Sequence, residues 1–503
     1  MVNPEKEHVL RTSLVLSGLR QKFFFHNSNK NHRKPLQIFG LIALYLLGLY
    51  ILGTFFQWGN ISLEFHDWKD ITAPRLTFQK DALNLGVLPL HISDKSTVGG
   101  VTDRYLSIPD VILSPQIFLL KFMDIGTFSV VNILLLYSIG YLGLIRLKKR
   151  FQLSPFIFTL LFLLFNFNGH ILAHLSIGHL TWVGYFLFPW FIDLIFAFLD
   201  GDKNWSWVAK MAFFLVFMFI QGSYHQFVWA LFFLGFLYII QPYKNWPALS
   251  AMVFGVLMSM FHIWPCTLSA DSFESNFHGG YTGPVNLLLS LSKIQLPDTY
   301  FDSPILQKSL GWWELSLYIG IVGTLFLFGF GIAGWWKNRN NLKNVRALIL
   351  PITGVSFLSF SVIYNFIRII PFPLLTGERV SSRMMILPVL FLLTIAAINF
   401  QQWINQHKPL PIWITCLILA LLAMLCIELW QNYQIWNVAS VAQVFSHETF
   451  TPTDWFVSNH YDDWLYFLTL RRGAAVSIFS MILLGAFIWN ENRENKSKSR
   501  FHK

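Results

Sequence analysis

Apolar segments about as long as a membrane is thick recur along the whole chain, and they restrict its fold more than any other feature. A helix needs about 20 mostly apolar residues to cross the hydrocarbon core of a bilayer. Helices are favoured over strands because a helix satisfies its own backbone hydrogen bonds in lipid. We therefore predict an all-α integral membrane protein with about twelve transmembrane helices. The predicted spans lie near 37–58, 125–145, 153–168, 180–199, 207–222, 226–242, 247–265, 315–336, 347–367, 384–400, 410–429 and 474–490.

The composition agrees with this class and argues against a soluble protein. Hydrophobic residues make up 54% of the 503 residues and charged residues only 13%, against about a quarter in soluble domains. The net charge of +11 would suit a nucleic-acid partner. We exclude nucleic acid because the basic residues lie in short clusters between apolar segments, as membrane orientation requires.

Lys and Arg residues gather in the short loops on one side of the predicted bundle, most densely at 146–150 and 337–346. Because such residues are retained on the cytoplasmic side, we predict that both termini are cytoplasmic in a bacterial-type inner membrane. The predicted parts are a basic cytoplasmic tail at 1–36, a polytopic membrane domain at 37–490 with outer loops near 59–124, 266–314 and 430–473, and a cytoplasmic tail at 491–503. Most polypeptide outside the membrane faces outward, so we expect the chemistry there.

The first outer loop contains signals for a helix outside the bundle. Thr72 and Pro74 are typical of a helix start and Gly86 of a helix stop. A second apolar stretch at 111–123 is interrupted by Pro115 and is too short for an independent span. We expect this stretch to lie along the membrane surface, in a first outer loop that is helical and amphipathic.

Asp67 lies just outside the first predicted span, next to His66 and flanked by Phe65 and Trp68. A carboxylate at the mouth of a helix bundle, partly shielded by aromatic rings, can act as a general base. Burial would raise its pKa and cationic neighbours would lower it. The alternative interpretation is a solvated loop aspartate beside a hydrophobic anchor.

Four stretches occur in an order that resembles one superfamily. They read DALNLGVLPL at 81–90, GHILAHLSIGHL at 169–180, GWWELSLYIG at 311–320 and GERVSSRMM at 377–385. Together with the acidic residue after the first span, they resemble the GT-C class of bacterial polytopic glycosyltransferase-like membrane proteins, including its YfhO-like group. The resemblance extends from the first outer loop to the start of the tenth predicted span.

This resemblance implies a sugar transfer outside the cytoplasm. GT-C enzymes take the sugar from a polyprenyl-phosphate carrier and pass it to a lipid, glycan or protein acceptor. Their catalytic carboxylate is an acidic residue of the first outer loop, and the matching position here is Asp67. A second hypothesis is a transporter or flippase of a lipid-linked glycan or anionic lipid, and a third is a non-catalytic membrane protein of envelope assembly.

Three arginines are candidates for binding the phosphate of the carrier. Arg368, Arg379 and Arg383 flank a short predicted outer segment, against the usual distribution of basic residues. Arg379 and Arg383 are four residues apart and would share a face if they lie on one helix. Arginine binds phosphate through paired donors and stays charged. The alternative is that these side chains reach toward lipid headgroups.

Histidines and one glutamate are the other candidates at the outer mouth. His170 and His174 have an i, i+4 spacing that can bind a metal, but no nearby Glu completes a zinc-protease pattern. We favour polar contacts, with His66, His174 and His179 as substrate-binding candidates. Glu314 would bind sugar hydroxyls or help to hold a divalent cation, the one cofactor that we consider; the alternative is a helix N-terminal acid.

A transporter would need polar residues along a path through the membrane. Two acidic residues, Asp193 and Glu428, fall within the predicted spans, where a charge is costly and usually has a partner. They are expected near opposite membrane faces, which gives the transport hypothesis little support.

Overall fold

The computed structural model describes residues 34–86, 88, 105–268, 277–303, 308–338, 343–369, 377–447 and 464–501. The protein is 79% helical, with almost no strand. The predicted basic tail at 1–36 lies almost entirely outside the described residues.

Membrane-spanning helices dominate the described part of the chain. Eight helices there are long and apolar enough to cross a bilayer, and a bent pair, Trp246–Met258 and Met260–Thr267, would make a ninth. The protein is therefore an all-α, multi-pass membrane protein, as predicted. The eight are Gln37–Phe55, Ile125–Arg150, Pro155–Ser176, Leu180–Leu199, Gly320–Lys337, Ser381–Gln406, Ile412–Trp436 and Trp464–Asn495.

Three further apolar helices coincide with the remaining predicted spans. They are Trp205–Ile220, Tyr224–Ile240 and Val345–Leu358. At 1.5 Å per residue, even the longest of them is shorter than the roughly 30 Å hydrocarbon core. The count of twelve transmembrane helices therefore stays a prediction.

Polar side chains cap the first turns of several helices, both at the surface and inside the apolar bundle. Asp124 accepts a hydrogen bond from the backbone N–H of Thr127 at the start of α4 (Ile125–Arg150). Asn168 accepts a hydrogen bond from the backbone N–H of Ile171 at the start of α6 (Gly169–Ser176). Helix α6 follows α5 (Pro155–Asn166) after a short break. Such caps satisfy N–H groups that would otherwise be buried without a partner.

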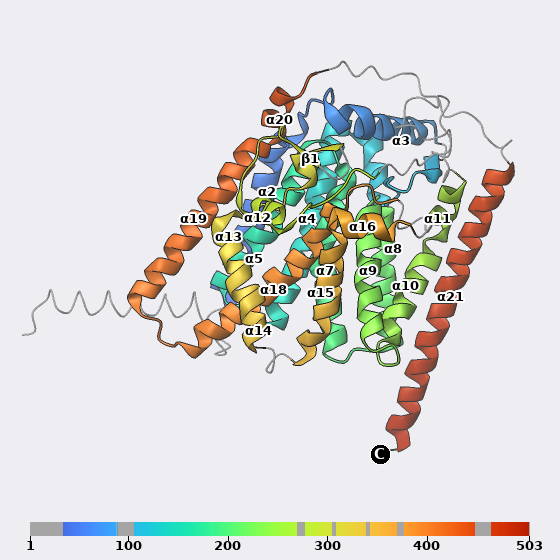
Figure 1. The fold of residues 1–503 in the computed structure, drawn as a ribbon. Helices are drawn as coiled ribbons and strands as arrows, with labels where there is room; N and C mark the ends of the chain where they lie inside the picture. Colours follow the sequence, from blue (N-terminus) through green and yellow to red (C-terminus); the bar gives the residue numbers. More distant parts are fainter. Residues whose placement is uncertain are drawn as a thin grey trace, which may run out of the picture.

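The elements outside the bundle gather mainly at one of its ends (Figure 1). Helix α3 (Ala73–Leu85) lies across this end, near α20 (Val438–Val444) and the hairpin of β1 (Tyr300–Ser303) with β2 (Lys308–Gly311). These elements come from the three long loops that were predicted on one side of the membrane. We call this the α3 end of the bundle.

The opposite end of the bundle carries short connections and one chain end (Figure 1). Helix α14 (Gly334–Asn338) lies there, and α21 (Trp464–Phe501) extends beyond the other helices. The predicted C-terminal tail at 491–503 therefore continues α21 as a helix through Phe501.

Helix α3 lies between the predicted start and stop positions. Pro74 lies in its first turn, and Gly86 ends it in the left-handed conformation with φ of 70°. Thr72 makes no side-chain cap, because it is itself helical and belongs to a π-helical turn that runs directly into α3. The stretch after Pro115 forms a 3-10 helix of eight residues, η4 (Pro115–Phe122), in which Phe122 is 80% exposed. Both are too short to cross a membrane.

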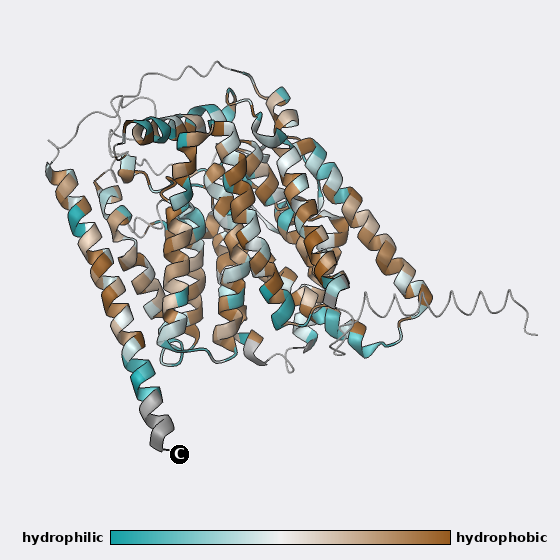
Figure 2. Cartoon of the chain, turned by 180° about the vertical axis from the view of Figure 1, so that it is seen from behind, coloured by the Kyte–Doolittle hydropathy of each residue, from teal (hydrophilic) through white to brown (hydrophobic). Residues whose placement is uncertain are grey.

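Hydrophobic residues predominate along the lengths of the helices, and hydrophilic ones are frequent on α3 and near the helix ends (Figure 2). The helices differ in how far they are covered by protein. The span Ser381–Gln406 is 94% buried, whereas Ile412–Trp436 is only 28% buried although it is the most apolar of all. Apolar side chains left open on a peripheral helix suit contact with lipid tails.

Candidate functional site

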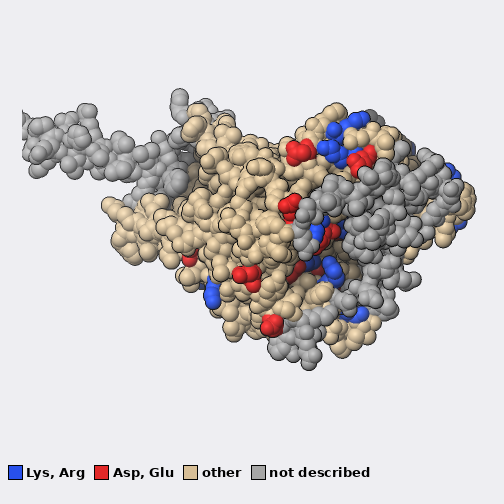
Figure 3. Space-filling view, turned by 90° about the horizontal axis from the view of Figure 1, so that it is seen from above, with Lys and Arg blue, Asp and Glu red and all other residues tan. Residues whose placement is uncertain are grey.

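A cavity of about 340 Å³ lies where α3 crosses its end of the bundle. Six of the predicted site residues line it: His66, Asp67, His179, Glu314, Arg379 and Arg383. Seen from above, several acidic and basic side chains lie close together near the middle of this face (Figure 3). A sparsely charged chain therefore concentrates predicted functional residues at one position.

The loop that carries Asp67 is held against the bundle by its neighbours. The buried indole of Trp68 donates a hydrogen bond to the carbonyl oxygen of Ser176 at 2.9 Å. Thr72 donates to the carbonyl oxygen of Gly178 at 2.5 Å. These two bonds join the π-helical turn η2 (Trp68–Thr72) to the chain that follows α6.

Glycine is required at position 178 for this close approach. Gly178 has φ of +104°, a conformation that other residues rarely adopt. A Cβ atom there would lie 2.3 Å from the backbone nitrogen of Trp68 and 2.7 Å from the carbonyl carbon of Asp67. The glycine therefore lets the next residue, His179, reach the carboxylate of Asp67.

Asp67, His179 and His174 form a chain of short hydrogen bonds. The Oδ2 atom of Asp67 lies 2.5 Å from Nε2 of His179, and Nδ1 of His179 lies 2.8 Å from Nδ1 of His174. His174 is buried and stacks on Trp182 with 4.4 Å between ring centroids. Thus His179 contacts the cavity, and His174 lies behind it rather than in the cavity wall.

His66 approaches the other oxygen of the same carboxylate. Its Nδ1 atom lies 3.4 Å from Oδ1 of Asp67, and its ring meets Trp313 edge-on at 4.7 Å between centroids. Burial alone would raise the pKa of Asp67, but hydrogen bonds and charges from His179 and His66 outweigh it and hold the pKa well below its usual range. Burial would lower the pKa of His66, but Asp67 raises it above its usual value.

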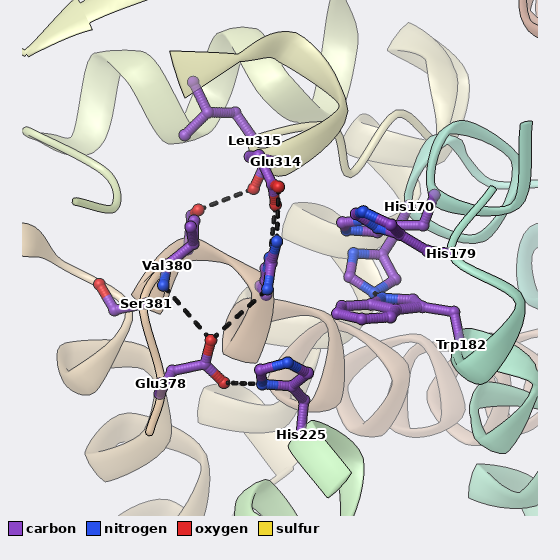
Figure 4. A network of polar contacts seen from close by, with 12 residues as sticks. His170, His179, Trp182, His225, Glu314, Leu315, Glu378, Val380 and Ser381 are labelled. Carbon is purple, nitrogen blue, oxygen red and sulfur yellow. Dashed lines mark hydrogen bonds and ion pairs between the residues drawn. The ribbon is translucent and has the colours of Figure 1, made fainter. Parts of the chain in front are cut away.

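Arg383 forms an internal ion-pair network instead of an open phosphate site. Both oxygens of Glu314 accept hydrogen bonds from its guanidinium, and Oε1 of Glu378 lies 3.9 Å from its Nη1 atom. Figure 4 shows Glu378 also facing His225, whose Nδ1 lies 2.9 Å from Oε2. The indole of Trp229 donates to the same oxygen at 2.9 Å.

The two buried glutamates of this network are kept ionised by their partners. Burial would raise the pKa of Glu314, but the charge and hydrogen bonds of Arg383 hold it below its usual value. Burial likewise opposes ionisation of Glu378, and the contacts with His225 and Arg383 lower its pKa. Glu314 therefore balances an arginine charge, which leaves it less available for a cation or a sugar.

Arg379 and Arg383 do not share a helix face as predicted. The 3-10 helix η10 (Ser381–Met385) begins after Arg379, so the two side chains have different surroundings. Arg379 is exposed and lines the cavity, and no described acidic residue pairs with it. Arg368 does not line the cavity, and its guanidinium lies over the ring of Phe277 at 5.0 Å.

Sequence reasoning missed Glu378 and the pair of Arg75 with Asp110. Glu378 lies in the GERVSSRMM stretch, five residues before Arg383, and this proximity was the one available signal. Nη1 of Arg75 donates to Oδ2 of Asp110 at 2.8 Å and both line the cavity. Their 35-residue separation leaves no pattern in the sequence.

The described residues offer no ligand set for the divalent cation that was considered. No group of three or more His, Cys, Asp and Glu side chains among them is arranged to hold a metal ion. His170, the other member of the i, i+4 pair, accepts a hydrogen bond from the indole of Trp182 at 3.2 Å. The histidines here contact aromatic rings and each other.

The two acidic residues within predicted spans are both engaged in structural contacts. Asp193 accepts hydrogen bonds from Arg146 at 2.9 Å and from Arg150 at 2.7 Å. Glu428 accepts from the backbone nitrogens of Ile321 and Val322 at 3.0 and 3.2 Å, so it caps α13 (Gly320–Phe326). Neither is open to a transported ion.

Comparison with known proteins gives no assignment. No family model, no curated protein and no solved structure matches this chain.

Proposed function

We propose that this protein is a GT-C-like glycosyltransferase that moves a sugar from a polyprenyl-phosphate carrier to a hydroxyl group of a lipid, glycan or protein acceptor. The observation that carries the proposal is that Asp67 and Arg379 line one cavity. An ionised carboxylate with histidine partners and an arginine without a described acidic partner are the two groups that such a transfer needs.

The chemistry of the transfer divides between these two groups. The acceptor oxygen forms a bond to the anomeric carbon of the sugar, and the bond from that carbon to the carrier phosphate breaks. The acceptor proton passes to a base at the Asp67 side of the cavity, which raises the nucleophilicity of the oxygen. The phosphate leaves as an anion, and Arg379 would stabilise its charge through charge-assisted hydrogen bonds.

The proposal places the α3 end of the bundle outside the cytoplasm. Twelve crossings would leave both termini on the cytoplasmic side of a bacterial-type inner membrane, next to the basic clusters at 146–150 and 337–346. A carrier lipid keeps its phosphate at the interface and its chain among the lipid tails. A cavity at the end of the bundle would lie at the same depth in the membrane as that phosphate.

The transport alternative has less support from the same contacts. Asp193 is neutralised by two arginines and Glu428 caps a helix, so neither is free to line a path. The non-catalytic alternative predicts no turnover at all, and the same experiment separates it from the transferase.

The test is turnover of a polyprenyl-phosphate-linked sugar by purified protein carrying Asp67→Asn. We expect the rate to fall by about 10²- to 10⁴-fold, the usual contribution of acid–base catalysis. Asp302→Asn is the matched control, because Asp302 is exposed in β1 at the same end of the bundle and does not line the cavity. Equal turnover by the Asp67→Asn variant and the wild type would remove this carboxylate from the mechanism.

A further inference from the structure

A row of three side chains forms one polar wall of the cavity: His66, Asp67 and His179. We propose that His66 is the catalytic base that takes the acceptor proton, and that Asp67 is the positioning residue that holds His66. This inference deepens the proposed glycosyl transfer and rests on it.

Both ring nitrogens of His179 are engaged. Nε2 contacts Asp67 and Nδ1 contacts His174, so His179 has no lone pair to offer a substrate. Both oxygens of Asp67 also have histidine neighbours, His179 at 2.5 Å and His66 at 3.4 Å. His179 therefore cannot accept a further proton, and Asp67 is a weak proton acceptor because its histidine neighbours lower its pKa.

His66 is different because only one of its nitrogens faces Asp67. Nδ1 is buried and makes no hydrogen bond, and the carboxylate of Asp67, 3.4 Å away, is the one described acceptor at ion-pair distance from it. A proton on Nδ1 would face this carboxylate, and that tautomer leaves the lone pair on Nε2. No described group bonds to Nε2, and the His66 side chain is 20% exposed where it lines the cavity.

The ring of His66 is held in place by the chain around it. The edge of Trp313 packs on one side and Phe445 lies 5.0 Å away between centroids. The backbone of His66 has φ of +45°, a conformation that non-glycine residues rarely adopt. A strained backbone that fixes a ring at a cavity wall is a common feature of functional sites.

The charges around His66 favour a base that works near neutral pH. Asp67, Asp70 and Glu314 raise its pKa against the effect of burial, and the arginines at 379 and 383 line the same cavity. An effective general base has a pKa near the working pH. Asp67, whose pKa is lowered, is a much weaker base.

The proposed step balances with no further reactant. Nε2 of His66 takes the proton of the acceptor hydroxyl as its oxygen bonds to the anomeric carbon, and the carrier phosphate departs with the bonding electrons. The imidazolium that forms is stabilised by the negative charge of Asp67, 3.4 Å from Nδ1. The proton then leaves His66 for water or for the departing phosphate.

The first test is histidine footprinting with diethyl pyrocarbonate, read by mass spectrometry across pH. We expect His66 to react with a midpoint above its ordinary value of 6.5, and His179 to stay protected. The exposed His407 is the positive control. In Asp67→Asn protein the midpoint of His66 should fall. Protection of His66 while His407 reacts, or an unchanged midpoint in the variant, would overturn the pairing.

The second test is kinetic. His66→Ala should lose about 10²- to 10⁴-fold in kcat with little change in KM, and added imidazole should restore part of it. Wild-type turnover should decline as pH falls through the pKa of His66, and Asp67→Asn should move this decline to lower pH. Turnover that stays level into acid would overturn His66 as the base, as would failure of imidazole to rescue.

These tests distinguish two kinds of failure. Absence of turnover in the wild type with every donor would contradict the proposed function and the catalytic role together. Footprinting needs no substrate, so it still decides whether Asp67 holds His66. Size-exclusion profiles of each variant in detergent establish that the protein is folded before either test.

Discussion

At the residue scale, the site depends on positions that allow an unusual backbone approach. Gly178 permits the contact between Asp67 and His179. Any side chain at this position would strain the backbone, because its φ is positive. The sequence presents this glycine only as part of a His-rich stretch. The sequence does not predict its role, because the clash that a Cβ atom at position 178 would cause is with Asp67 and Trp68, more than 100 positions away.

Replacement of this glycine should disturb the site and the fold together. Gly178→Ala should lower turnover and cost about 1–3 kcal/mol in stability, the usual size of such backbone strain. Gly235→Ala is the control, because a Cβ there meets nothing within 4 Å and the position is helical. Thermal unfolding and turnover of both variants check this. A Gly178→Ala protein as stable and active as the control would contradict the packing described.

The buried glutamates make stability depend on acidity. Glu314 and Glu378 have folded pKa values below their usual 4.5, so their contribution is present above about pH 4.5 and is lost as pH falls through the folded values. The unfolding temperature should therefore drop on acidification below this range.

Arg383→Met should lower stability by about 3–5 kcal/mol at neutral pH, because it leaves buried carboxylates without their partner. The variant should also flatten the acid dependence, and an unchanged pH profile would contradict the network.

At the element scale, local signals predicted α3 and failed for the arginine pair. Gly86 ends α3 in the left-handed conformation, and Pro74 lies in its first turn, so both signals are readable from the sequence. Thr72 makes no side-chain cap, because its hydroxyl donates to Gly178 instead. The predicted common face of Arg379 and Arg383 required one helix through both. The helix instead begins at Ser381, because the chain before it pairs with another segment: Gly279 bridges Val380, and Ser381 donates its N–H to the Gly279 carbonyl oxygen. Pairing between distant segments leaves no local pattern.

The placement of α3 over the cavity should depend on the Arg75–Asp110 ion pair. Arg75 belongs to α3 and Asp110 to the chain before η4, so their contact ties two parts of the first outer loop together. Arg75→Ala and Asp110→Ala should each speed hydrogen exchange of α3 amides. Their effects on stability should be non-additive by about 0.5–3 kcal/mol. Additive effects in the double variant would show that the pair does not act as a unit.

At the scale of the whole molecule, the length of the apolar segments predicted more of the fold than motifs did. Every predicted span is helical, although those near 247–265 and 347–367 are each divided between two helices. Hydrocarbon thickness and backbone hydrogen bonding constrain a membrane chain strongly. Which side chains meet at the α3 end was predicted only in part. Asp67 and Arg379 line one cavity as expected, whereas Arg383 and Glu314 neutralise each other. Ion pairing is decided by three-dimensional neighbours, which the order of residues does not reveal.

A sugar transfer in this cavity requires that it bind a polyprenyl phosphate through Arg379. The most direct measurement is the affinity of purified protein for a polyprenyl phosphate that carries no sugar, by native mass spectrometry, for the wild type, Arg379→Gln and Arg368→Gln. We predict about tenfold or greater weakening for Arg379→Gln, the value of a charge-assisted hydrogen bond of about 1.5–3 kcal/mol, and near wild-type binding for Arg368→Gln. Equal binding by the wild type and Arg379→Gln, or no binding by the wild type, would contradict the account.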